Sequence, residues 1–239
     1  MIVDCHVHVK GGDLYRREFS APQILKAMDE AGVDKSCIFA MSLPSRESND
    51  LMIQVYQQAP DRFIPFAHVV PTEGIVASLE MTRALTALNC RGVKMHIGEL
   101  AKVDLNDLTP VVRRCTEARI PLLIDIAERL DVAQYLAAEA RECNVVIAHM
   151  GSPTDERFVD GIIALAYEHA NMYVDTSYSM VPWKIGDAIS VLGPDKVIWG
   201  SDGPLTHPSI ELQKLRALNL HEEVFQKVTC DNIRRLTGV

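Results

Sequence analysis

Residues 132–149, VAQYLAAEARECNVVIAH, decide the fold class because they contain one complete helix-to-strand unit. The segment 132–142 is rich in Ala, Leu and Glu, which are strong helix formers. Val145-Val146-Ile147 is β-branched throughout and shows no alternation of apolar and polar residues, so we expect a strand that is buried on both faces. Strands of this kind are typical of a parallel sheet that is covered by helices.

The same unit recurs along the whole chain, with no linker between the repeats. A second helix is predicted over Ile24–Ala31, after a capping Ser20 and before Gly32. Eight repeats predict an α/β fold, a (β/α)8 TIM barrel formed by residues 1–239 as a single domain. An open doubly wound sheet is the alternative, but it usually carries a Gly-rich loop after the first strand, and the glycines here have the wrong spacing. The strands are predicted at Ile2–His8, Ser36–Met41, Phe63–Val69, Gly92–Ile97, Pro121–Ile126, Asn144–His149, Met172–Asp175 and Val197–Asp202.

Composition narrows the class of ligand and the compartment. The net charge of −8, without a basic run, argues against a nucleic-acid partner, so we expect a small-molecule substrate. No apolar run is long enough to cross a membrane, and the N-terminus lacks the features of a secretory signal. Most of the six dispersed cysteines are expected to be small buried hydrophobic residues in a reducing compartment. The expected location is therefore cytoplasmic, with no membrane partner.

The first predicted strand carries a His-x-His pair, His6 and His8. Side chains two apart on a strand point to the same face, so both imidazoles can reach one metal ion. Neutral imidazole is the commonest protein ligand of zinc, although two histidines can also fall on one strand by chance. His68 and His207 lie near other strand ends and are weaker candidates for the same pocket.

Further polar side chains lie at or near the C-terminal ends of the predicted strands, where barrels of this type carry their chemistry. Asp202 can ligate a metal or accept a proton, or it can be an ordinary turn residue. His149 can be a metal ligand, an acid or base, or a structural histidine. Facing inward, Lys94 and His96 would bind substrate, whereas facing outward they would only solvate the strand. Asp125 interrupts an apolar run, so a cation is expected beside it. If the strands are placed correctly, these residues converge on one pocket.

In their order along the chain, four short motifs resemble the amidohydrolase superfamily, and within it the amidohydrolase-related (amidohydrolase 2) group of metal-dependent hydrolases and decarboxylases. The motifs are His6-x-His8, Gly-Val-Lys-Met-His at 92–96, Ala-His-Met-Gly at 148–151 and Gly-Ser-Asp-Gly-Pro at 200–204. The resemblance implies one divalent metal held by His6, His8 and Asp202, and a catalytic or substrate-polarising role for His149. Barrels of this family are often dimers or larger, so a homo-oligomer is also implied.

At the end of strand five this sequence departs from the family, because Asp125 stands where members usually have a histidine ligand. A carboxylate can ligate zinc and also suits manganese or magnesium, so Asp125 is a fourth candidate ligand, with His96 as the alternative and zinc as the first choice of metal. Some lactone hydrolases of the family lack that histidine and work without a metal.

The function we expect from the sequence is a metal-dependent hydrolase that cleaves an ester, lactone or amide bond of a small carboxylate-bearing substrate. In this hypothesis Asp202 takes a proton from a metal-activated water, His149 polarises the scissile carbonyl, and Lys94 and His96 bind substrate. The alternatives are a metal-dependent decarboxylase of an aromatic or unsaturated acid, a metal-independent lactonase, and a barrel that binds a ligand without catalysis.

Overall fold

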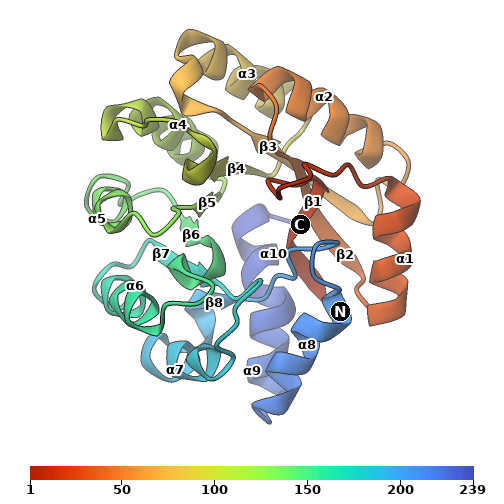
Figure 1. The fold of residues 1–239 in the computed structure, drawn as a ribbon, viewed down its shortest axis with the longest axis vertical. Helices are drawn as coiled ribbons and strands as arrows, with labels where there is room; N and C mark the ends of the chain where they lie inside the picture. Colours follow the sequence, from red (N-terminus) through yellow and green to blue (C-terminus); the bar gives the residue numbers. More distant parts are fainter.

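The computed structural model describes residues 1–239 and contains one sheet of eight parallel strands, which neighbour one another in chain order from β1 to β8 (Figure 1). The strands are β1 (Val3–Lys10), β2 (Lys35–Ala40), β3 (Phe63–His68), β4 (Gly92–His96), β5 (Leu122–Asp125), β6 (Val145–Ile147), β7 (Met172–Asp175) and β8 (Val197–Ile198). The helices are α1 (Ala21–Ala31), α2 (Ser45–Tyr56), α3 (Ile75–Thr86), α4 (Leu105–Ala118), α5 (Leu130–Glu139), α6 (Glu156–Glu168), α7 (Trp183–Leu192), α8 (Pro208–Ala217), α9 (Glu222–Gln226) and α10 (Asn232–Thr237).

The sheet closes on itself between β1 and the segment that follows β8. The Cys5 amide donates to the Trp199 carbonyl at 3.3 Å, and the His8 amide donates to the Gly203 carbonyl at 2.7 Å. These bonds join the first and last parts of the sheet, which lie at opposite ends of the chain. The predicted TIM-barrel fold is confirmed, and an open doubly wound sheet is excluded.

All eight predicted strands are present, and the differences lie at their ends. The strand expected to reach Asp202 ends its pairing at Ile198, and the strand expected to reach His149 ends at Ile147. His149 and Asp202 adopt left-handed backbone conformations, with φ of 54° and 61°, which are incompatible with strand pairing. β1 is longer than predicted because it pairs with β2 as far as Lys10.

Local helix signals are mostly accurate. The predicted helix at Ile24–Ala31 is α1, which begins three residues earlier because the Ser20 amide donates to the side chain of Gln23 at 2.8 Å. It ends as expected at Gly32, whose φ of 74° suits a residue without a Cβ. The helix predicted over 132–142 is α5, which ends earlier than expected, at Glu139.

A β-bulge in β1 sets the direction of the two histidines. Asp4 pairs with Ser36 and Val7 pairs with Ile38, so three steps along β1 match only two along β2. Before this irregularity, Val3 and Cys5 belong to the inner core, whereas after it Val7 and Val9 belong to the outer core. A bulge re-aims the side chains that follow it, and here it leaves both histidines pointing into the barrel.

Two apolar clusters hold the fold together. The larger lies between the strands and the helices around them, and the smaller takes residues from seven strands and so fills the barrel interior. Ile233 and Leu236 of α10 pack into this inner cluster with Val3 and Ile198, and α10 lies across the centre of the ring in Figure 1. All six cysteines are buried and free, as expected. None of the helices combines the length and the apolar character needed to span a membrane.

Candidate active site

A cavity of about 350 Å³ opens at the C-terminal end of the barrel. Side chains from strands β1, β4 and β5 meet there with residues that follow β6 and β8. All seven site residues predicted from the sequence line it: His6, His8, Lys94, His96, Asp125, His149 and Asp202. The expected convergence of distant residues is therefore present, and the contacts divide the seven into two groups.

The first group contains His6, His8 and Asp202, which offer two ring nitrogens and a carboxylate oxygen to one small volume. Oδ1 of Asp202 lies 2.7 Å from Nε2 of His8 and 3.2 Å from Nε2 of His6. Burial raises the pKa of Asp202, but the charge and hydrogen bond of His8 oppose it and hold that pKa well below its usual value. Asp202 is therefore an ionised carboxylate against two imidazoles.

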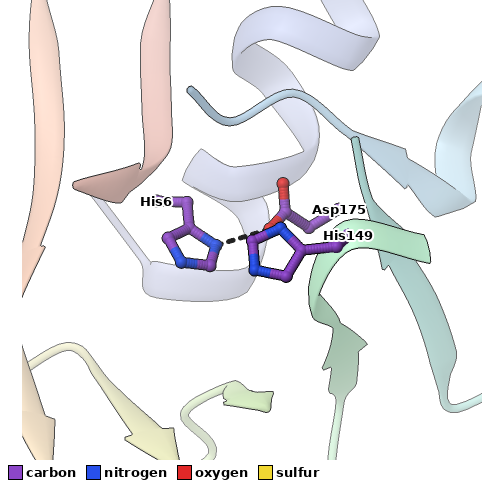
Figure 2. A group of neighbouring side chains, drawn as sticks. All are labelled: His6, His149 and Asp175. Atoms are coloured by element: carbon purple, nitrogen blue, oxygen red, sulfur yellow. Dashed lines mark hydrogen bonds and ion pairs between the residues drawn. The ribbon is translucent and has the colours of Figure 1, made fainter. Parts of the chain in front are cut away.

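A residue that the sequence reasoning missed, Asp175 at the end of β7, fixes the ring of His6 (Figure 2). Nδ1 of His6 donates to Oδ2 of Asp175 at 2.6 Å, and the Ser177 hydroxyl donates to the same oxygen at 2.7 Å. Burial lowers the pKa of His6 well below its usual value, so the ring is neutral and its proton sits on Nδ1. Nε2 of His6 consequently presents a lone pair toward the cavity.

Lys94 places a buried amino group beside the same residues. Its Nζ lies 3.1 Å from Nε2 of His6 and 5.0 Å from the centre of the Phe39 ring. Burial lowers the pKa of Lys94, while the charges of Asp125 and Asp202 oppose that effect. The amino group thus faces inward, among carboxylates that favour its charged form.

The second group contains Asp125, His96 and His149. Oδ2 of Asp125 lies 3.0 Å from Nε2 of His96 and 3.5 Å from Nε2 of His149. Nδ1 of His149 donates to the Ser177 carbonyl at 2.9 Å. Burial lowers the pKa of His149, but the hydrogen bond to Asp125 and the charges of Asp202 and Asp125 outweigh it and raise that pKa to about 9. The cation expected beside Asp125 is therefore the imidazolium of His149, and His96 is a second contact of the same carboxylate.

The donor set of the first group fits a divalent metal. Ligand atoms about 2.1 Å from one ion lie about 3.0–3.4 Å apart, close to the separations found between Asp202 and the two rings. His6, His149 and Asp175 form another cluster of possible ligands, but Nδ1 of His6 already donates to Asp175 there, and Asp175 does not line the cavity. Asp125 belongs to neither cluster. Nδ1 of His8 is buried without a hydrogen-bond partner, so the contact of Nε2 with Asp202 is the only hydrogen bond that orients this ring.

His207, a weaker candidate, lies elsewhere. It precedes α8, accepts from the Ser209 amide, and pairs with Glu30 at 3.1 Å. His68 is buried and lines a neighbouring cavity rather than the one described above.

Solved structures of known enzymes share this fold over nearly their whole length. A 2,6-dihydroxybenzoate decarboxylase from Rhizobium matches with a TM-score of 0.80 at 17% identity, over 99% of this chain and 98% of that one. A 5-carboxyvanillate decarboxylase from Sphingomonas paucimobilis matches with a TM-score of 0.78 at 17% identity, over 100% and 99%. A dihydroxybenzoic acid decarboxylase from a Polaromonas species, with bound manganese and the inhibitor 2-nitroresorcinol, matches with a TM-score of 0.77 at 14% identity, over 99% and 96%.

At these identities the likeness shows a shared fold. No curated protein matches the sequence. The family model described as amidohydrolase matches residues 3–239, which is nearly the whole sequence. The chain therefore belongs to the amidohydrolase family, as its motifs indicate.

Proposed function

We propose that this protein is a metal-dependent decarboxylase of a small aromatic or unsaturated carboxylic acid. The observation that carries the proposal is His149, an imidazolium held at the cavity wall between the Ser177 carbonyl and the Asp125 carboxylate. Decarboxylation needs a proton donor at the carbon that loses its carboxylate, and a histidine with a pKa of about 9 is protonated at neutral pH. The decarboxylases that share this fold support the same reading.

In this proposal His6, His8 and Asp202 hold the metal, and two imidazoles with a carboxylate suit zinc and manganese alike. Bound there, a divalent metal would act as a Lewis acid toward the oxygen atoms of the substrate. We assign Asp125 to positioning His149, because it contacts that ring and His96 rather than the three ligands.

The remaining steps use side chains of the chain itself. Lys94, whose ammonium is buried at the cavity, binds the substrate carboxylate. His149 gives a proton to the carbon that bears this carboxylate, and the carbon–carbon bond then breaks, its electron pair returning to the substrate as carbon dioxide leaves. Asp125 holds the imidazolium in place before the transfer and accepts its hydrogen bond.

Hydrolysis is the second candidate, because Asp202 adjoins both possible histidine ligands and could accept a proton from water. A general base works best when its pKa lies near the working pH, and the strongly lowered pKa of Asp202 makes it a weak base. That difference is why we place decarboxylation first.

A paired assay tests the proposal. Manganese-loaded protein is incubated with a panel of hydroxy- and methoxybenzoates and unsaturated acids, with carbon dioxide release as the readout, and in parallel with esters, lactones and amides. We expect release of carbon dioxide from at least one acid, and its loss in His149→Asn. His221→Asn, an exposed histidine with no side-chain hydrogen bond, is the control and should keep full activity. Turnover confined to the ester, lactone and amide panel would refute the decarboxylase proposal in favour of hydrolysis.

A further inference from the structure

A second cavity of about 460 Å³ adjoins the first, and Gly12 and His96 line both. Its wall comes from the last residues of β3 and β4 and from the connections that follow β1, β2, β3 and β4, so it lies at the same end of the barrel. A substrate seated in the first cavity could extend into this one past His96. None of the other residues of the first cavity lines it.

His68 is the most deeply buried polar side chain of this second cavity. Only 3% of its side chain is exposed, and its Nδ1 lies 3.2 Å from the Ser48 hydroxyl. That hydroxyl donates its single proton to the Leu43 carbonyl at 3.2 Å, so Nδ1 must be the donor of the pair. Burial lowers the pKa of His68 to about 4, which leaves the ring neutral. Nε2 of His68 is therefore an acceptor, and no hydrogen bond satisfies it.

Glu99 places a second acceptor opposite this nitrogen. Its two carboxylate oxygens accept from the amide and the hydroxyl of Ser42, which fixes the direction of the carboxylate. Oε2 of Glu99 lies 4.0 Å from Nε2 of His68, which is too long for a hydrogen bond. Two acceptors thus face one another with no donor between them. A third acceptor, the carboxylate of Glu73, also lines the cavity.

Part of the remaining wall is apolar, with Leu43, Val69 and Leu100 among its members. Arg16 is the only guanidinium or ammonium group on it, and that residue is exposed at the surface. A ligand that suits this cavity therefore has a carbon skeleton for the apolar wall and a positively charged hydrogen-bond donor for the acceptors.

We propose that the second cavity is a subsite for a protonated nitrogen of the substrate, an ammonium or amidinium group that donates to Nε2 of His68 and to Glu99. This inference rests on the proposed function, because it makes the substrate an acid with its reacting carboxylate in the first cavity and a cationic group in the second. The preferred substrates are then amino- or amidino-substituted acids rather than purely phenolic ones.

The test uses benzylamine and benzyl alcohol as probes, since they share a ring but differ in the charged donor and carry no carboxylate. Metal-loaded, isotope-labelled protein is titrated by NMR, with the Ser42 amide as the reporter because it donates to Glu99. We expect benzylamine to bind at least about tenfold more tightly than benzyl alcohol, as hydrogen bonds to charged groups imply. Glu99→Gln should remove that preference, whereas Glu168→Gln, which changes an exposed carboxylate without hydrogen bonds, should keep it.

A second variant tests the subsite independently, in case Glu99→Gln does not fold. Val70→Phe narrows the cavity from its rim and leaves Glu99 in place, and it should weaken both probes together. Equal binding of the two probes to the wild type, or an unchanged preference in a folded Glu99→Gln, would overturn the subsite. The readout does not depend on turnover. If benzylamine binds preferentially but no acid is decarboxylated, the subsite is supported and the proposed function is refuted. If an acid is decarboxylated but the two probes bind equally, only the subsite is refuted.

Discussion

Replacing Asp175 with Asn should weaken metal binding although none of the proposed ligands is substituted. Oδ2 of Asp175 accepts from Nδ1 of His6 and from the Ser177 hydroxyl, while Oδ1 accepts from the Ser177 amide. If the Asn side-chain oxygen keeps the hydrogen bond from the Ser177 amide, its NH2 group points toward Nδ1 of His6 and the Ser177 hydroxyl. His6 then moves its proton to Nε2 in order to accept from the Asn, and that proton faces the metal site. The lone pair needed for coordination is lost.

Loss of such a supporting hydrogen bond typically costs about 10- to 100-fold in metal affinity, or about 1.4–2.7 kcal/mol. The free energy of unfolding of the metal-free protein should also fall by about 1–3 kcal/mol, because a buried charge-assisted hydrogen bond is replaced by a neutral one. Metal affinity is measured by competition with a chelator, and stability by urea denaturation in the presence of that chelator. Asp61→Asn, an exposed side chain with no hydrogen bonds, is the control. A folded Asp175→Asn that binds manganese within twofold of the wild type would show that Asp175 does not set the tautomer of His6.

Four further outcomes follow from the same geometry. Lys94→Met should raise KM for the acid substrate by about tenfold or more through loss of a charged hydrogen bond, with a smaller change in kcat, as steady-state kinetics will show. Activity that depends on protonated His149 should fall as the pH rises through about 9, and a pH–rate profile flat to pH 10 would contradict this. Because the pKa of His149 is raised on folding from 6.5 to about 9, its contribution to stability should be full below pH 6.5 and lost as the pH rises through about 9, which urea denaturation across that range measures. Gly92→Ala should lower the free energy of unfolding by about 1–3 kcal/mol, since its Cβ would overlap the Phe66 ring, and an unchanged urea midpoint would argue against that packing.

The strands and several site residues could be predicted because their signals are local. A β-branched run such as Val145-Val146-Ile147 indicates a strand by itself, and the parallel sheet follows from the repetition of such runs. The convergence of His6 and Asp202 followed from the rule that barrels gather polar residues at one end. Asp175 carried the same signal as Asp125, a carboxylate that closes an apolar run, and was readable from Met172-Tyr173-Val174-Asp175.

Other features depend on contacts between distant segments, which no local pattern encodes. The strand alternation alone does not reveal the bulge in β1, because its cause is the register against β2. The grouping of Asp125 with His96 and His149 depends on how three strand ends approach one another. The second cavity combines Ser42 and Glu99, from the connections after β2 and β4, with His68 at the end of β3, and the adjacent positions of these strands in the sheet bring them together.

In the proposed metal site, two imidazoles of β1 and the carboxylate after β8 share one divalent ion. This arrangement can be examined by anomalous diffraction from crystals of the protein loaded with manganese. We expect a single strong peak within coordination distance of Nε2 of His6, Nε2 of His8 and Oδ1 of Asp202. A peak centred instead on Asp125, or no peak in crystals that contain manganese, would contradict the proposed arrangement.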